Sequence, residues 1–143
     1  MTAASQSIMQ TAGSSGSISM KSVWAGRIVS GLVTVFMIFD AVIHLLKPAP
    51  VVEAFAKLNF PLRLAVPLGI IELMCILLYV IPSSSILGAI LLTGYLGGAV
   101  AIQLPTGNSL FGEILFPVYT GVFLWGGIYL RDARLRALIP FQT

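Results

Sequence analysis

Three ionisable side chains inside apolar stretches are the strongest candidates for chemistry in this sequence. Asp40 and His44 are four residues apart, so a helix places them on one face. Glu72 lies in the next apolar stretch, with no cation at helical spacing on its own segment. A charge at the centre of a membrane span costs about 2.5–3.5 kcal/mol on insertion scales, so such residues commonly serve a function. Because carboxylates and imidazole exchange protons, we take Asp40, His44 and Glu72 as candidate catalytic residues.

Further polar side chains in or beside the apolar stretches are candidates for ligand binding: Tyr95, Gln103, Glu113 and Tyr119. The polar positions also have structural explanations. His44 near a helix end can face lipid headgroups, and Asp40 with His44 can form a pair that locks helix packing. Glu113 in a first helical turn is stabilised by the helix dipole.

The cysteine and histidine content limits the cofactors that this chain can hold. Cys75 is the only cysteine, which excludes an intramolecular disulfide and a Cys-x-x-Cys redox pair, and we interpret it as a small packing residue. His44 is the only histidine, so one chain cannot supply bis-histidine haem ligation, although a single axial His44 is allowed. With only these two nitrogen and sulfur donors, we predict no metal site. A quinone is favoured over haem as the cofactor.

The composition is that of an integral membrane protein. Of the 143 residues, 57% are hydrophobic and 9% are charged, whereas a soluble domain carries about 25% charged residues. A chain with so little charge must have the lipid bilayer as its solvent. The net charge of +3 is small and no run of Lys and Arg forms a patch, so no nucleic-acid partner is expected.

Four apolar stretches are each long enough to cross the bilayer as a helix. The predicted spans are residues 23–46, 62–81, 85–104 and 111–130. Continuous apolar runs without alternation favour helices over strands, so the predicted fold class is an all-α, integral membrane four-helix bundle. The predicted domain organisation is a disordered Ser/Gly-rich tail (1–20), the four-span domain (21–137) and a short C-terminal tail (138–143).

The first two spans are joined by a patterned segment. Val51, Phe55 and Leu58 recur at helical spacing, so we expect a short amphipathic helix at the membrane surface. Pro67 and Pro117 fall inside the second and fourth spans, where each predicts a kink near the helix entry. The alternative is that both helices begin at the proline.

Four spans place both termini on one side of the membrane, and we call the half of the bundle remote from them the outer half. Asp40, His44, Glu72, Gln103 and Glu113 all fall at or beyond the midplane toward that half, which predicts a polar pocket capped by the amphipathic segment. Lys and Arg are more numerous at the end that carries the termini, which favours a cytoplasmic location for both termini.

The third span is rich in small residues. Gly94 and Gly98 form a Gly-x-x-x-Gly pair of the kind that lets helices approach closely. We interpret the pair as packing within the bundle, and self-association into a homo-oligomer through the same residues is the alternative.

The stretches 39–52, 87–99, 115–119 and 125–132 together resemble the DoxX-like family of small bacterial membrane proteins. The resemblance implies a four-helix protein of the bacterial inner membrane. The wider family takes its name from a subunit linked to thiosulfate:quinone oxidoreduction, and some relatives associate with redox enzymes. The family pattern also includes a Thr-His pair followed by a basic residue near the end of the third helix. This chain has Ile102, Gln103, Leu104 and Pro105 there, which puts any role of that histidine in doubt here.

Three functions are consistent with these features. The favoured hypothesis is a redox-associated subunit that binds a quinone or similar apolar ligand in the outer pocket, together with a membrane or redox partner protein. The second is a cofactor-free membrane enzyme, such as an isomerase, acting on an apolar substrate. The third is a non-enzymatic scaffold or transport subunit. The sequence leaves open whether the protein is an enzyme.

Overall fold

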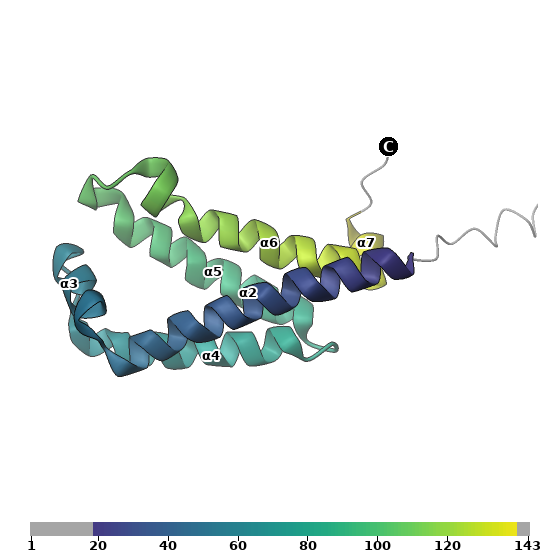
Figure 1. Cartoon of the computed structure of the whole chain (residues 1–143), viewed down its shortest axis with the longest axis horizontal. Coiled ribbons are helices and arrows are strands. Elements are labelled where there is room, and N and C mark those ends of the chain that lie inside the picture. The colour runs from purple at the N-terminus through teal and green to yellow at the C-terminus, as the bar shows by residue number, and fades with distance from the viewer. Residues whose placement is uncertain (1–18, 140–143) are drawn as a thin grey trace, which may run out of the picture.

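The structure is a computed structural model that describes residues 19–139, and this part of the chain contains helices and no strands. Figure 1 shows a bundle of long helices with one short helix across one end and another at the opposite end. The helices are α2 (Met20–Leu46), α3 (Ala49–Lys57), α4 (Ala65–Val80), α5 (Ser85–Gln103), α6 (Phe116–Arg131) and α7 (Ala133–Leu138). The predicted tail up to residue 18 lies outside the described residues, and α2 begins at Met20.

Four segments of the described chain are long and apolar enough to cross a membrane. They are Met20–Leu46, Leu62–Val80, Ser85–Thr106 and Leu110–Arg131. Only 22–33% of the residues in the most apolar window of each segment are buried within the protein, and many large apolar side chains are exposed, as is favourable in lipid. The predicted fold class is therefore confirmed: a four-helix membrane bundle with a short helix between the first two spans.

Pro67 and Pro117 mark the places where two spans change from one helix type to another. α4 begins at Ala65 and α6 at Phe116, so each proline falls within the first three positions of its α-helix, where a missing N–H costs little. The 3₁₀ turn η1 (Leu62–Leu64) precedes α4, and the π-helical turn η3 (Leu110–Ile114) precedes α6. Neither α-helix begins at its proline, as the alternative states, because α4 begins before Pro67 and α6 before Pro117, and the preceding turns supply the rest of each span.

The four long helices form a ring in which each packs against two neighbours. α2 packs against α4 and α6, and α5 packs against the same two helices from the opposite side. The N-terminal end of α2 and α7 lie together at one end of the bundle, while α3 lies across the other, outer end (Figure 1). We call the end that carries Met20 and α7 the inner end.

The inner half of the bundle is closely packed. A Cβ at Gly26 on α2 would lie 2.8 Å from the Gly127 carbonyl oxygen on α6, and a Cβ at Gly88 on α5 would collide with the backbone of Tyr79 on α4. The Tyr79 hydroxyl, buried at the centre, lies 3.0 Å from the Leu124 carbonyl oxygen and 3.1 Å from the Ser30 hydroxyl oxygen. Glycine here allows backbones to meet, so the inner half has little free space.

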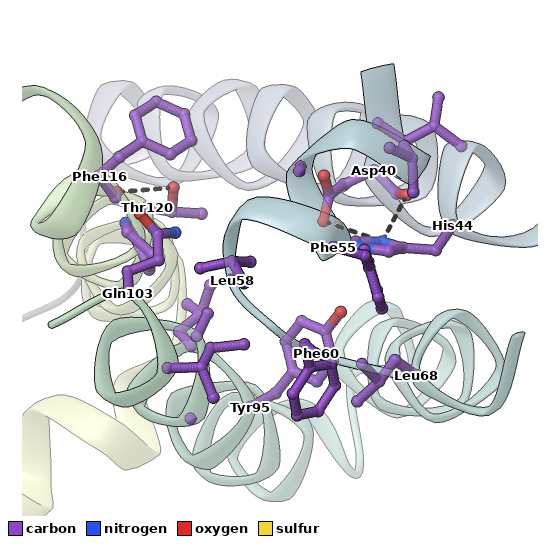
Figure 2. A pocket seen from close by; sticks show the side chains of 18 of the residues that line it. Asp40, His44, Phe55, Leu58, Phe60, Leu68, Tyr95, Gln103, Phe116 and Thr120 are labelled. Atoms are coloured by element: carbon purple, nitrogen blue, oxygen red, sulfur yellow. Dashed lines mark hydrogen bonds and ion pairs between the residues drawn. The ribbon is translucent and has the colours of Figure 1, made fainter. Parts of the chain in front are cut away.

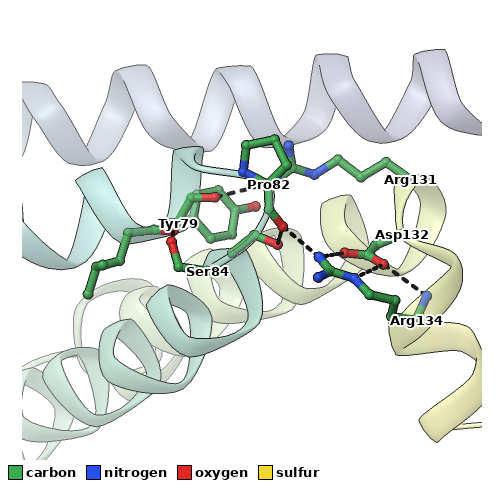
Figure 3. Close-up of polar contacts among 8 residues, drawn as sticks. Tyr79, Pro82, Ser84, Arg131, Asp132 and Arg134 are labelled. Atoms are coloured by element: carbon green, nitrogen blue, oxygen red, sulfur yellow. Dashed lines mark hydrogen bonds and ion pairs between the residues drawn. The ribbon is translucent and has the colours of Figure 1, made fainter.

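Basic side chains close the inner end by binding carbonyl groups at the end of α4 and in the turn that follows it (Figure 3). Arg131 donates to the Tyr79 carbonyl at 3.4 Å, and Arg134 donates to the Pro82 carbonyl at 2.5 Å and to the Asp132 carboxylate at 2.8 Å. These contacts satisfy carbonyls near the end of α4. The hydrogen bonds from Arg134 hold the pKa of Asp132 below its ordinary value of 3.8. Asp132 also caps α7, a helix that the sequence did not predict, by accepting from the Arg134 backbone N–H at 2.9 Å.

Candidate functional site: a cavity in the outer half of the bundle

The outer half of the bundle is hollow, in contrast to the inner half. It encloses a cavity of about 590 Å³, which we call the outer cavity, between α2, α3, α4, α5 and α6. Its volume falls in the range of about 300–1,000 Å³ that is usual for small-molecule sites. Most of the wall is apolar: Phe36, Met37, Ile43, Pro50, Val51, Ala54, Phe55, Leu58, Phe60, Leu68, Leu96, Ala99, Ile102, Phe116 and Pro117. The polar lining side chains are Asp40, His44, Tyr95, Gln103 and Thr120.

Helix α3 forms the roof of the outer cavity. α2 ends where Lys47 adopts a left-handed backbone (φ 49°) and Pro48 follows, so the chain turns sharply before α3 begins at Ala49. Val51 and Phe55 are the buried face of α3. The Phe55 ring stands edge-on to the His44 ring, with centroids 5.9 Å apart. The predicted amphipathic helix therefore exists, and its apolar face covers the polar residues of α2.

Four polar side chains from three helices meet at one side of the outer cavity, and we call them the carboxylate–histidine cluster: Asp40 and His44 on α2, Glu72 on α4 and Tyr95 on α5. His44 Nδ1 lies 3.0 Å from the Asp40 carbonyl oxygen, 3.5 Å from Asp40 Oδ2 and 3.8 Å from Glu72 Oε2. The Tyr95 hydroxyl donates to Glu72 Oε2 at 2.9 Å. The sequence predicted Asp40, His44 and Glu72 at or beyond the midplane toward the outer half, and the structure brings these three into contact and adds Tyr95.

The four members of the cluster differ in their access to the outer cavity. The side chains of Asp40 and His44 are 34% and 18% exposed and line the wall, whereas Glu72 is fully buried. Glu72 contacts two lining residues, His44 and Tyr95, and its Oε1 atom has no hydrogen-bond partner among the described residues. A cluster with one fully buried carboxylate and three groups that line the cavity can accept protons from, or donate them to, a molecule there.

Gly69 sets the separation of α2 and α4 at this cluster. A Cβ at Gly69 would lie 2.9 Å from the Ala41 carbonyl oxygen and 3.2 Å from His44 Cβ. Glu72 is three residues further along α4, almost one turn, and therefore reaches His44 because the backbones are close. The glycine thus positions two of the predicted catalytic residues.

Gly94 and Gly98 on α5 widen the outer cavity rather than packing against another helix. Both line the cavity, and a Cβ at either position would meet nothing within 4 Å. The interpretation of this pair as helix packing within the bundle is therefore wrong. Self-association through the pair stays a prediction.

The structure separates the four predicted ligand-binding residues into two groups. Tyr95 and Gln103 line the outer cavity; Figure 2 shows Tyr95 facing Asp40 and His44 across the open space, with Gln103 farther along near Thr120. Glu113 is exposed in η3, and Tyr119 lines a shallower groove between α2 and α6. Sequence reasoning missed the aromatic wall of Phe36, Phe60 and Phe116. The first and fourth spans each hold several aromatic residues, and Phe60 lies between spans, so spacing along the sequence does not show which of them share a cavity.

The comparisons with known proteins give one match. Residues 28–127 match the model of the DoxX-like family, and this segment contains every member of the carboxylate–histidine cluster. No curated protein and no solved structure matches the chain.

Proposed function

This chain belongs to the DoxX-like family, and we propose that it is a membrane subunit that binds a quinone, or a similar apolar ligand with a polar head, in the outer cavity. The observation that supports this function is the chemistry of the cavity wall. Apolar side chains line most of the space, and Asp40, His44 and Tyr95 are gathered on one part of it. Such a site suits a molecule with an apolar body and a few oxygen atoms at one end.

A quinone ring matches this division. Its flat ring packs against aromatic side chains such as Phe36, Phe55 and Phe60, and its carbonyl oxygens need hydrogen-bond donors. The His44 imidazole and the Gln103 amide can donate, and the carboxyl groups of Asp40 and Glu72 can hold the protons that a quinone takes up on reduction. Reduction to the quinol consumes two electrons and two protons. The cluster can supply the two protons, and an electron donor must supply the two electrons.

A partner protein is the source of electrons in this proposal. The chain has a single cysteine, which cannot form a redox-active disulfide within the chain. A membrane or peripheral redox enzyme that docks near α3 would deliver electrons at the end of the bundle where the ligand binds. Co-purification of a stoichiometric redox enzyme, with loss of quinone reduction in His44→Ala, is the expected result.

The proposed location is the bacterial inner membrane with both termini in the cytoplasm. The inner end carries Lys21, Arg27, Arg131, Arg134 and Arg136, whereas Lys47, Lys57 and Arg63 belong to the outer end. The larger number of basic residues favours the cytoplasm for the inner end. The outer cavity then opens in the periplasmic half of the membrane. Reporter fusions at the C-terminus test this orientation.

The experiment that tests the proposed function uses the full chain purified in mild detergent. A visible absorption spectrum is recorded, and an organic extract is then analysed by mass spectrometry. The expected result is a near-stoichiometric quinone or similar apolar molecule in the wild type and its loss in His44→Ala. An extract with only bulk phospholipid, together with no binding of added quinone, contradicts the proposal.

A further inference from the structure

We infer that Asp40, His44 and Glu72 bind one divalent cation of the first transition row, such as Mn²⁺, Fe²⁺ or Zn²⁺. The inference concerns the carboxylate–histidine cluster itself and does not depend on an organic ligand in the outer cavity. A metal was not expected from the sequence, because only one histidine and one cysteine were available as conventional donors. The fold adds two carboxylates from different helices to that histidine.

The geometry of the three side chains suits a shared ion. Each offers one ligand atom, and these atoms all lie within 4.8 Å of one another. His44 Nδ1 is 3.5 Å from Asp40 Oδ2 and 3.8 Å from Glu72 Oε2. Two ligands each about 2.1 Å from one ion are separated by about 3.0–4.2 Å in tetrahedral or octahedral geometry. Small side-chain movements are therefore enough to bring the three atoms onto one ion.

Charge balance also favours a divalent cation. Asp40 and Glu72 belong to two neighbouring spans, their ligand atoms lie within 4.8 Å of each other, and within residues 19–139 the ion-pair partner of each is His44 alone. A protonated imidazole neutralises one negative charge, whereas a divalent cation neutralises both. Neutrality matters here because isolated charge in a low-dielectric interior is strongly unfavourable.

Glu72 provides an independent indication of a ligand. Its side chain is fully buried, Oε2 accepts from Tyr95, and Oε1 has no partner among the described residues. An unsatisfied carboxylate oxygen in the interior is costly, and a cation bound by both oxygens of Glu72 would give Oε1 the partner that it lacks. The Tyr95 hydrogen bond resembles the outer contacts that orient metal-binding carboxylates in other proteins.

An ion can reach the cluster from the outer cavity, and one side of the cluster faces that cavity. Asp40 and His44 line the outer cavity, so an ion can enter from it, and ligand positions not filled by protein face it. One imidazole nitrogen with carboxylate oxygens suits Mn²⁺, Fe²⁺ or Zn²⁺, whereas Cu⁺ prefers sulfur and Ca²⁺ requires six or more oxygens. Binding through Nδ1 replaces the contact with the Asp40 carbonyl and requires that nitrogen to be deprotonated, so apparent affinity falls at low pH.

The test uses the full chain in detergent, purified through a tag without histidine, stripped with a chelator and dialysed against Zn²⁺ or Mn²⁺. Metal content is measured by mass spectrometry, and Co²⁺ loading is followed by visible absorption. We expect one ion per chain in the wild type and affinity about tenfold or more weaker in Glu72→Gln, Asp40→Asn and His44→Gln. The control is Glu53→Gln, which makes the same substitution as Glu72→Gln at an exposed position on α3, and this variant should retain the ion.

Thermal unfolding and one further variant separate loss of the ion from loss of the fold or of an organic ligand. Thermal unfolding without metal checks that each variant folds, and added metal should raise the Tm of the wild type and of Glu53→Gln but not that of Glu72→Gln. No retained ion in the folded wild type, or equal retention by Glu72→Gln, would overturn the inference. Gly98→Leu distinguishes it from the proposed function, because this variant should keep the ion while losing an organic ligand.

Discussion

His44 Nδ1 on α2 lies 3.8 Å from Glu72 Oε2 on α4, and this contact joins two spans at the wall of the outer cavity. It exists because Gly69 lets the backbones of α2 and α4 approach almost one helical turn before Glu72. The Tyr95 hydroxyl adds a third span to the same carboxylate at 2.9 Å. The packing of three spans therefore holds a buried carboxylate beside an accessible imidazole.

Gly69→Ala should separate His44 from Glu72. The added Cβ would lie 2.9 Å from the Ala41 carbonyl oxygen, so the helices must move apart. We expect a loss of about 1–3 kcal/mol in the free energy of unfolding, measured in mixed detergent–SDS titrations. The matched control is Gly94→Ala, whose Cβ meets nothing within 4 Å and which should be no less stable than the wild type. Equal destabilisation of the two variants would show that Gly69 has no special positioning role.

The sequence predicted the spans well because lipid imposes a simple requirement. About 20 consecutive apolar residues are needed for each crossing, and the four predicted ranges agree with the observed ones within a few residues. The relative depth of Asp40, His44 and Glu72 also followed from counting residues along antiparallel helices. The depth of a residue in the membrane, however, does not show in which direction its side chain points around the helix axis. That is why Glu113 and Tyr119, which lie in the same part of the sequence as lining residues, do not face the outer cavity.

The role of glycine was the least predictable feature. Gly88 and Gly98 are both on α5, yet one permits close contact with Tyr79 and the other leaves open space. The Gly-x-x-x-Gly pattern indicates only that a face lacks side chains. Whether another helix or a cavity occupies that face depends on where the neighbouring helices diverge, and the pattern does not contain that information.

Tyr79→Phe should weaken the inner half without changing the outer cavity. The substitution removes the hydroxyl that lies between Ser30 and the Leu124 carbonyl, at 3.1 and 3.0 Å. We expect a cost of about 1 kcal/mol in the free energy of unfolding. A double-mutant cycle with Ser30→Ala isolates the contact between the two side chains. Unchanged stability in Tyr79→Phe would show that this buried hydrogen bond contributes nothing to the packing of the inner half.

The Asp132–Arg134 contact should persist in mildly acidic solution. Hydrogen bonds from Arg134 lower the pKa of Asp132 below its ordinary value of 3.8. A group whose pKa is lowered on folding contributes stability above its unfolded pKa and loses that contribution as the pH falls through the folded pKa. NMR titration of the Asp132 carboxyl should therefore give a midpoint below 3.8 in the wild type and a higher midpoint in Arg134→Gln. Identical midpoints in the two proteins would rule out this cause.

A comparison of Gly98→Leu with Gly97→Leu tests whether the outer cavity is the binding site. Neither added Cβ meets an atom within 4 Å, so both variants should fold, but Gly98 lines the outer cavity whereas Gly97 lines a separate groove between α5 and α6. The amount of quinone or other apolar molecule extracted per chain, or the binding of added quinone, is measured for each purified variant. We predict that Gly98→Leu loses the ligand and that Gly97→Leu retains it at the level of the wild type. Equal retention by both variants would contradict the assignment of the outer cavity as the binding site.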